Sequence, residues 1–250
     1  MKSLDELIQK LAQKSIPKEI FLDSLSKCRK MYDSLDLQIE LMIANGLPLE
    51  YDEKNYFLTT SKTKIVDQSF CIVDIETNGN SPDHGQIIEI GAIKFKNGTI
   101  IDTYESFAFA KEIPEYISQV TGITAQMTHS SPPIQIVLEE FKIFLDQDTF
   151  VAHNVNFDYK FISKSLELYN LGELLNRKLC TIDLAKKLIQ AEKYGLESLK
   201  ELLGINSVHH RAMNDAQSSM MILKHCINLL PKEIITTEDL IRFSKHNIKK

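Results

Sequence analysis

The spacing of apolar and polar residues divides the chain into a helical N-terminal part and a longer part in which strands and helices alternate. In the first part, apolar residues recur at helical spacing three times and then alternate in two short runs joined by a polar turn. This pattern predicts three helices and a hairpin, over residues 4–11, 17–25, 34–44, 47–51 and 56–58. Three helices followed by a hairpin outline a small winged-helix-like module over residues 1–64, and the polar stretch 59–64 is the expected linker.

Charge decides between two roles for this module. Winged helices often bind DNA, but residues 1–64 hold ten basic and ten acidic side chains. Because phosphate binding needs an excess of Lys and Arg, a packing or partner-docking role is favoured.

Residues 65–231 predict an α/β domain with a mixed sheet flanked by helices. Apolar alternation predicts five strands, over residues 70–77, 86–96, 99–110, 149–152 and 178–182. Helical spacing predicts helices over residues 114–120, 132–145, 156–171, 183–191, 196–203 and 212–230. The Asn97-Gly98 pair is a strong hairpin signal between the second and third strands. Residues 232–250 are expected to be a tail, in which 238–243 form a plain amphipathic turn or a short docking motif.

The first strand of this domain carries two carboxylates. Asp74 and Glu76 are separated by one residue, so their side chains point to the same face. Two like charges held this close disfavour ionisation unless a cation lies between them. The strand alone leaves two interpretations open: a divalent metal site, or a pair of solvated carboxylates on an edge strand.

Three further clusters lie where a predicted strand ends or a helix begins. Asp158 falls in the first turns of the helix that follows His153-Asn154, where it could be a metal ligand or only a capping carboxylate. Asp215 falls in the first turn of the last helix, and His210 lies on the loop before it. Glu89 is a polar residue in an apolar strand and is expected either to support the site or to face solvent.

Together these residues resemble the signatures of the DEDDh exonucleases. Asp74-Ile75-Glu76-Thr77, His153-Asn154 with Phe157-Asp158, and His210-Arg211-Ala212 with Asp215-Ala216 match in order and spacing. The resemblance covers about residues 68–230. The family includes ribonuclease T, oligoribonuclease and the epsilon (proofreading) subunit of DNA polymerase III, and it implies a ribonuclease H-like fold.

The resemblance also implies a role for each matched residue. Asp74, Glu76, Asp158 and Asp215 would bind two divalent cations, Mg²⁺ or Mn²⁺, and His210 would be the general base. The family's spacing to Asp215 selects His210 over His209. Three residues, Ile75, Thr77 and Asn154, would contact the terminal nucleotide. Many family members have Thr where this chain has Asn78, which leaves the shape of that pocket open.

We therefore expect a 3′–5′ exonuclease of the epsilon-subunit type that acts on single-stranded or frayed DNA ends and releases nucleoside 5′-monophosphates. The alternatives are an RNA-trimming enzyme of the same family and a polymerase-associated docking subunit with incidental nuclease activity. A replicative DNA polymerase subunit is the expected partner.

Composition limits where such an enzyme would act. Residues 65–231 hold fourteen basic and twenty-one acidic side chains, so bound cations would have to offset part of this charge near phosphate.

The four cysteines have no CxxC spacing, and no apolar run of about 18 residues occurs, which predicts a cytoplasmic protein away from membranes.

Overall fold

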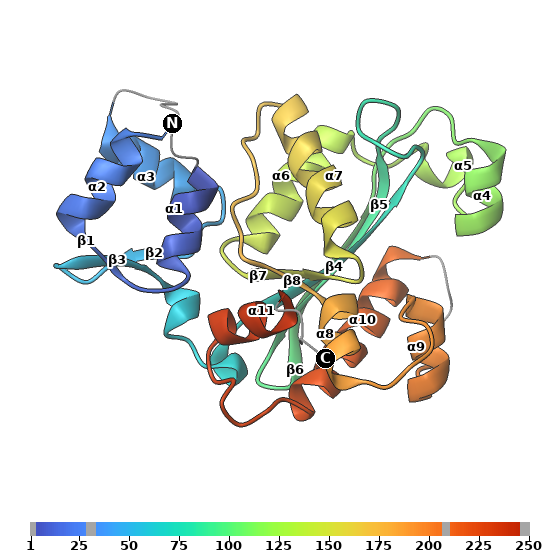
Figure 1. The fold of residues 1–250 in the computed structure, drawn as a ribbon. Helices are drawn as coiled ribbons and strands as arrows, with labels where there is room; N and C mark the ends of the chain where they lie inside the picture. The colour runs from blue at the N-terminus through green and yellow to red at the C-terminus, as the bar shows by residue number, and fades with distance from the viewer. Residues whose placement is uncertain (1–3, 29–33, 207–210, 246–250) are drawn as a thin grey trace.

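The computed structural model describes residues 4–28, 34–206 and 211–245, which form a small N-terminal part beside a larger α/β domain (Figure 1). The N-terminal part contains, in order, α1 (Leu4–Leu11), β1 (Ile16–Pro17), α2 (Lys18–Ser26), α3 (Leu35–Ala44), β2 (Leu49–Tyr51) and β3 (Asn55–Leu58). The predicted helices and hairpin are present. The two-residue strand β1, which the sequence analysis did not predict, completes a three-stranded sheet of order β1-β3-β2.

A five-stranded mixed sheet forms the centre of the larger domain. Its strands are β4 (Phe70–Thr77), β5 (Ile87–Lys96), β6 (Thr99–Phe107), β7 (Thr149–Ala152) and β8 (Lys178–Cys180), in the order β6-β5-β4-β7-β8. Neighbours β4, β5 and β6 are antiparallel, whereas β7 and β8 run parallel to β4. Asn97 and Gly98 adopt positive φ angles of 52° and 75° in the β5–β6 turn, the conformation that this residue pair favours. The predicted mixed α/β sheet is confirmed.

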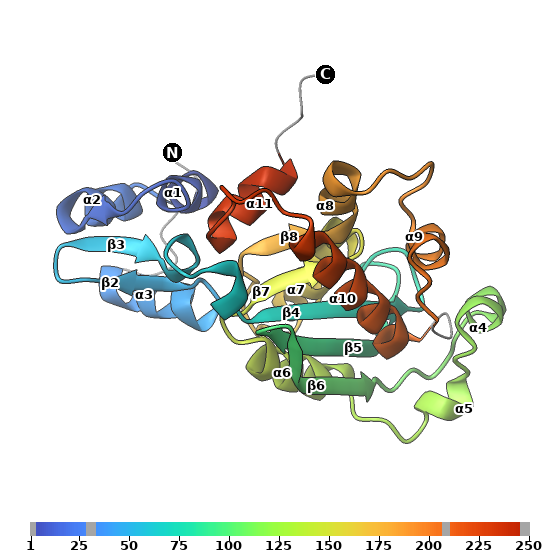
Figure 2. The same cartoon turned by 90° about the horizontal axis from the view of Figure 1, so that it is seen from below.

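Helices cover both faces of this sheet (Figures 1 and 2). The helices of this domain are α4 (Glu115–Thr121), α5 (Ala125–Thr128), α6 (Ile134–Leu145), α7 (Val155–Leu168), α8 (Thr181–Leu188), α9 (Leu196–Leu203), α10 (Ala212–Asn228) and α11 (Thr237–Lys245). Of these, α4 and α5 lie beyond one end of the sheet (Figure 2), and short 3₁₀ turns lie at Thr59–Ser61 and Ile65–Asp67.

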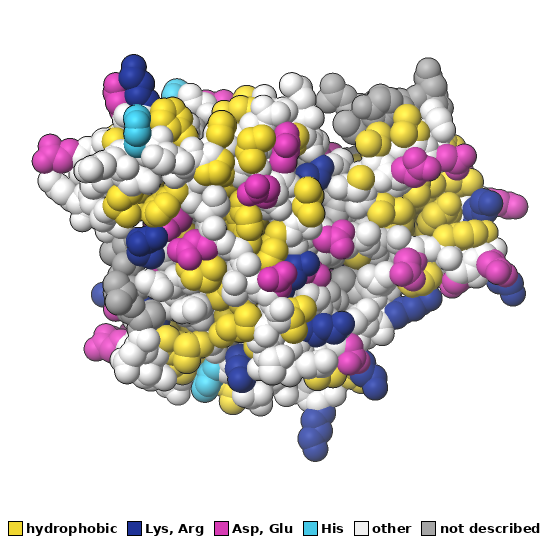
Figure 3. All heavy atoms as spheres, turned by 180° about the vertical axis from the view of Figure 1, so that it is seen from behind, with side chains coloured by type: hydrophobic (Ala, Val, Ile, Leu, Met, Phe, Trp, Pro, Cys, Tyr) yellow, Lys and Arg dark blue, Asp and Glu magenta, His cyan; other side chains and the backbone are white. Residues whose placement is uncertain are grey.

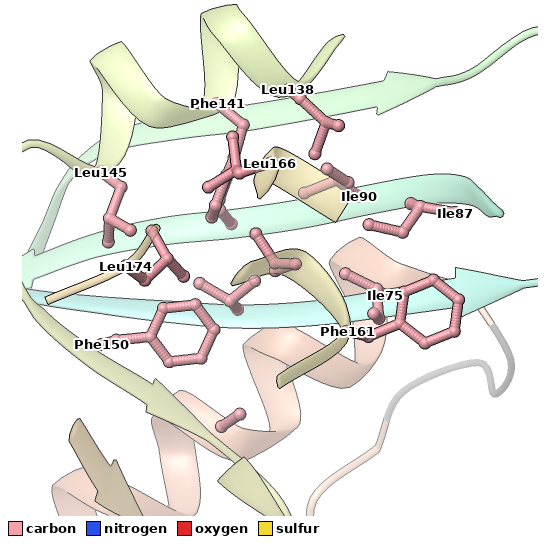
Figure 4. Packing of buried hydrophobic residues seen from close by; sticks show 14 of the residues in the cluster. Ile75, Ile87, Ile90, Leu138, Phe141, Leu145, Phe150, Phe161, Leu166 and Leu174 are labelled. Carbon is pink, nitrogen blue, oxygen red and sulfur yellow. The ribbon is translucent and has the colours of Figure 1, made fainter. Parts of the chain in front are cut away.

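The alternation of strand β4 divides its side chains between two cores. Val73 and Ile75 pack with α6 and α7, in the cluster of Figure 4 that includes Phe141 and Phe161. Phe70 and Ile72 pack on the opposite face, in a core built with α8, α10 and α11. Since side chains alternate along a strand, Asp74 and Glu76 continue the second row and face the same side as α10.

The C-terminal segment differs from its prediction. Residues 238–243 lie within a helix rather than a plain turn, and Leu240 and Ile241 are almost fully buried in the domain core. The prediction of a plain turn was wrong because the apolar side chains of this segment pack in the domain core and extend it into a helix. In the structure Glu238 is 3% exposed, and its carboxylate accepts hydrogen bonds from Arg177 Nε and Nη2 at 2.6 and 2.8 Å.

The polar stretch 59–64 packs against this helix. Thr60 is fully buried and donates a hydrogen bond to Glu238 Oε1 at 2.8 Å. The backbone N–H of Ile65 donates to the Ile235 carbonyl at 3.0 Å. The junction between the two parts of the chain is therefore held by the C-terminal helix.

Smaller differences from the predicted elements lie at the end of β8 and after α4. Strand β8 ends at Cys180, and the next helix begins at Thr181, two residues earlier than predicted. The short helix α5 follows α4 and was not predicted. No helix in the described ranges is long and apolar enough to cross a bilayer.

Candidate active site

Strand β4 presents the first two carboxylates of the site. Asp74 pairs with Gly91 of β5, and Glu76 pairs with Glu89, one residue before the register shifts at Thr77. Both side chains are half-buried. As the sequence predicted, they are neighbours on one face of the strand, and this face lies under the N-terminal end of α10.

The third carboxylate, Asp215, comes from the first turn of α10. Ligand oxygens of Asp74, Glu76 and Asp215 all lie within 4.8 Å of one another. Residues about 140 positions apart in the sequence thus meet at one point because α10 packs across β4 and β5.

A glycine allows this close packing. A Cβ atom added to Gly91 would lie 2.3 Å from the backbone nitrogen of Met213 and 2.4 Å from the carbonyl carbon of Ala212. Because these are backbone atoms, they cannot move aside without displacing the helix. The missing side chain at Gly91 therefore determines how near Asp215 comes to β4.

Glu89 fixes the orientation of the same helix end. Its side chain is fully buried, so the alternative that it faces solvent is wrong. One carboxylate oxygen accepts from Arg211 Nε and Nη2 at 2.9 and 2.7 Å, and the other accepts from the Ala212 backbone N–H at 3.0 Å. The latter group is one of the N–H groups that a helix leaves without an internal partner. Glu89 thus acts as a cap supplied by a neighbouring strand.

Arg211 was missed as a site residue by the sequence analysis. Besides its bonds to Glu89, its guanidinium lies over the ring of Phe107 at 5.0 Å, and its charge partly opposes the rise in the pKa of Glu76 that burial causes. The only sequence signal was its place between His210 and Ala212 in the third motif.

The fourth carboxylate, Asp158, lies in the first turn of α7 and is 4% exposed. Its charge is the largest electrostatic influence on Asp74 after burial. Burial raises the pKa of Asp158 to about 7, although hydrogen bonding to the backbone N–H groups of Asp158 and Ile75 opposes this rise. Asp158 thus acts electrostatically on Asp74, but it is not one of the three carboxylates whose oxygens lie within 4.8 Å of one another, and its role as a metal ligand stays a prediction.

Burial and mutual repulsion perturb the other carboxylates in the same direction. The pKa of Asp74 rises well above its ordinary value because the group is buried and faces Asp158, Glu76 and Asp215. The pKa of Glu76 rises to about 7, mainly through burial and then through Asp215 and Glu89. Without a cation, the folded protein resists placing full negative charge here.

The donor set fits a divalent cation bound through oxygen. The clustered groups are all carboxylates, with neither thiolate nor imidazole among Asp74, Glu76 and Asp215. Hard ions such as Mg²⁺ and Mn²⁺ prefer such ligands, and their charge would remove the repulsion that raises the pKa values.

Three of the remaining predicted residues, Ile75, Thr77 and Asn154, lie on strand β4 or at the start of α7. Thr77 ends β4 and donates to the Gly79 carbonyl at 2.8 Å, and Asn154 precedes α7 in a left-handed conformation with φ of 77°. The Ile75 side chain is 6% exposed within the core, which leaves only its backbone for contact with a ligand. His209 and His210 lie outside the described residues.

His153 is held by a side chain and a backbone carbonyl that lie outside the acidic cluster. Its Nδ1 lies 2.8 Å from Thr181 Oγ1, and its Nε2 lies 3.0 Å from the Tyr194 carbonyl oxygen. Both ring nitrogens are therefore engaged, and burial lowers the pKa to about 4.

Sequence comparison gives the family that the three motifs resemble. The sequence model of the exonuclease family that includes ribonuclease T matches residues 71–223. The PolC-type DNA polymerase III of Thermotoga maritima is 36% identical over 172 residues, which is 68% of this chain and 13% of that relative. The PolC-type enzyme of Clostridium perfringens is 38% identical over 202 residues, which is 76% of this chain and 14% of that relative. The chain thus spans about an eighth of the length of these relatives.

Solved structures share the fold. Exonuclease X in complex with 5′-overhanging duplex DNA matches with a TM-score of 0.57 and 24% identity, over 70% of this chain and 99% of that chain. Exonuclease I matches with a TM-score of 0.61 and 16% identity, over 71% of this chain and 43% of that chain. With the family model covering well over half of the sequence, this chain belongs to the family of ribonuclease T and DnaQ-like 3′–5′ exonucleases, which are hydrolases.

Proposed function

We propose that this chain removes nucleotides from the 3′ end of DNA, by metal-dependent hydrolysis that releases nucleoside 5′-monophosphates. The observation that supports this most directly is the meeting of Asp74, Glu76 and Asp215 within 4.8 Å, beside the buried Asp158. The likeness to PolC-type polymerases and the DNA complex of Exonuclease X favour DNA over RNA as the substrate.

The carboxylates have distinct positions in this proposal. The charges of Asp158, Glu76 and Asp215 all act on Asp74, which is therefore the proposed ligand shared by two ions. Glu76, Asp158 and Asp215 supply the outer ligands. Two bound Mg²⁺ or Mn²⁺ ions would lower the pKa of an attacking water and stabilise the charge that develops on the leaving oxygen.

His210 is the proposed general base, which takes the proton from the attacking water. It directly precedes Arg211 in the sequence, and Arg211 is held by Glu89 at the end of α10. Replacing a general base costs about 10²–10⁴ in rate. Glu89 and Arg211 would thereby position both Asp215 and the chain that bears His210.

The terminal nucleotide would lie near the end of β4 and the start of α7. Thr77, Asn154 and the backbone of Ile75 are the proposed contacts. Asn78, which differs from many family members, is already engaged: its Oδ1 accepts from the Gln86 backbone N–H at 2.7 Å and its amide donates to the Glu112 carbonyl at 3.3 Å. It thus shapes the loop beside the site and does not need to touch the substrate.

The proposal is tested with matched DNA and RNA oligonucleotides, one set labelled at the 5′ end and one blocked at the 3′ end. Asp74→Asn should reduce hydrolysis of DNA by several orders of magnitude while circular dichroism stays unchanged. Products should be mononucleotides, and a 3′ block should stop the reaction. Near-normal activity of Asp74→Asn would refute the site, cleavage of a closed circle would refute the exonuclease mode, and faster digestion of RNA would favour the RNA-trimming alternative.

The N-terminal part is proposed to be a winged-helix-like docking module. Its support is the order of elements, three helices with a sheet of order β1-β3-β2 and a β2–β3 hairpin, together with its balanced charge. A replicative polymerase is the proposed partner, because the curated relatives are PolC-type polymerases. A truncated protein that starts at Ile65 should keep hydrolysis of short oligonucleotides and lose partner binding. Loss of cleavage in folded, truncated protein would place the module in the active site.

A further inference from the structure

An apolar hollow lies at the opposite end of the sheet from the acidic site. Its volume is about 540 Å³, and its walls are the 3₁₀ turn before β4, the β5–β6 hairpin, the last turn of α10 and the loop that leads to α11. Asp215 is in the first turn of α10, whereas Ile227 in its last turn lines the hollow. Twelve residues of helix place them about 18 Å apart. The hollow is therefore separate from the catalytic cluster.

The lining combines aliphatic side chains with lysines. Val66 and Ile235 line the hollow and are 58% and 54% exposed, which is high for large aliphatic residues. Four lysines lie among the lining residues: Lys64, Lys96, Lys224 and Lys232. None of the described lining residues is acidic, although Asp67 and Glu233 are neighbours in sequence. Figure 3 shows Lys and Arg side chains between hydrophobic ones low on the molecule, at the height where Figure 1 places the end of α10.

This concentration of positive charge contrasts with the rest of the chain. The whole protein has a net charge of −5, and residues 65–231 are its most acidic part. Four lysines around an apolar depression, with no acidic side chain in its lining, complement a ligand that is itself apolar and negatively charged.

We propose that this lysine-rimmed hollow docks a short acidic peptide segment of a partner protein, with an aliphatic or aromatic anchor side chain in the hollow and carboxylates beside the lysines. A volume of about 540 Å³ accommodates one or two large side chains. Lysines at the rim would steer the partner and set its orientation, and burial of the anchor would supply most of the affinity.

Two other occupants fit less well. Single-stranded nucleic acid binds to exposed aromatic rings, but the two aromatic residues of the lining, Phe70 and Phe95, are only 1% and 4% exposed. A second copy of the chain in a two-fold contact would place the same patch against itself, so lysines would face lysines. An acidic peptide has neither disadvantage.

Fluorescence anisotropy of the full chain with a labelled acidic peptide tests the proposal. The probe is a fluorescein-labelled peptide with four aspartates around a central Leu-Phe pair, and its control carries asparagines in place of the aspartates. Lys96→Glu combined with Lys232→Glu should weaken binding at least tenfold, and Ile235→Asp should do the same by placing a charge at the apolar wall. Lys10→Glu with Lys14→Glu, an equal charge change on exposed residues of the N-terminal part, is the matched control.

Hydrolysis of a short oligonucleotide should be unchanged in all these variants, so this test is independent of the nuclease assignment. Equal peptide affinity in the two double variants would overturn the proposal. The proposal would also be overturned if the wild type bound an oligothymidine but not the peptide, and if Lys96→Glu with Lys232→Glu removed that oligothymidine binding. A wild-type dimer that becomes monomeric in this double variant would assign the hollow to a second copy and would also overturn it.

Discussion

The raised pKa of Glu76 predicts how the metal-free protein responds to pH. Its ordinary value of 4.5 rises to about 7 in the folded state. Between these two pH values the folded protein keeps a proton on Glu76 that the unfolded chain has lost. The resulting contribution to the free energy of unfolding is fully present below about pH 4.5 and is lost as the pH rises through about 7. At about 1.4 kcal/mol for each tenfold change in proton affinity, the loss is about 3 kcal/mol by about pH 8.

Glu76→Gln removes this ionisation while keeping the shape of the side chain. In the presence of a chelator, urea unfolding should show the variant more stable than the wild type by up to about 3 kcal/mol near pH 8, with the gap closing near pH 5. Asp74 and Asp158 remain, so part of the pH dependence should persist. Glu40→Gln, an exposed carboxylate in α3, is the control and should not change the slope.

Addition of Mg²⁺ should make the wild type more stable than Glu76→Gln. A cation binds the ionised carboxylates of the folded state, so the wild type should gain stability, and the variant, which lacks one ligand, should gain less. Parallel curves for wild type and Glu76→Gln between about pH 5 and 8 in chelator would refute the reasoning, because Glu76 would then ionise as easily in the folded as in the unfolded chain.

Three further substitutions test the packing and the chemistry. Gly91→Ala should push the end of α10 from the sheet, with a loss of about 1–3 kcal/mol in urea unfolding and about 10² in the rate of hydrolysis, and unchanged kinetics would contradict this close contact. Glu238→Ala leaves the buried Arg177 without its partner and should reduce the free energy of unfolding by about 3–5 kcal/mol, whereas a loss below about 1 kcal/mol would show the pair to be solvated. His210→Ala should slow hydrolysis by about 10²–10⁴ in single-turnover kinetics, with His209→Ala much less affected, and the opposite ranking would reassign the base.

Local sequence determined the strand-based half of the site. The two-residue spacing of Asp74 and Glu76 in an apolar run placed both side chains on one face of β4, and the structure confirms this. The Asn97-Gly98 pair set the β5–β6 hairpin, and helical periodicity located α6, α7 and α10 to within a few residues. These features follow from backbone geometry over a few residues, which is why the pattern of residues suffices to predict them.

Only the tertiary structure decided which polar residues support the site and which segments belong to the core. The partners of Glu89 and Glu238 are distant in the sequence: Arg211 lies 122 positions after Glu89, and Arg177 lies 61 positions before Glu238. A buried carboxylate is tolerated only when a cation or an N–H group bonds to it. A contact between residues this far apart in the sequence cannot be predicted from the local pattern of apolar and polar residues. The same holds for Gly91, because the backbone that packs against it belongs to Ala212, 121 positions later in the sequence. Sequence determined the elements and the order of the carboxylates, and three-dimensional packing determined the support that brings them together.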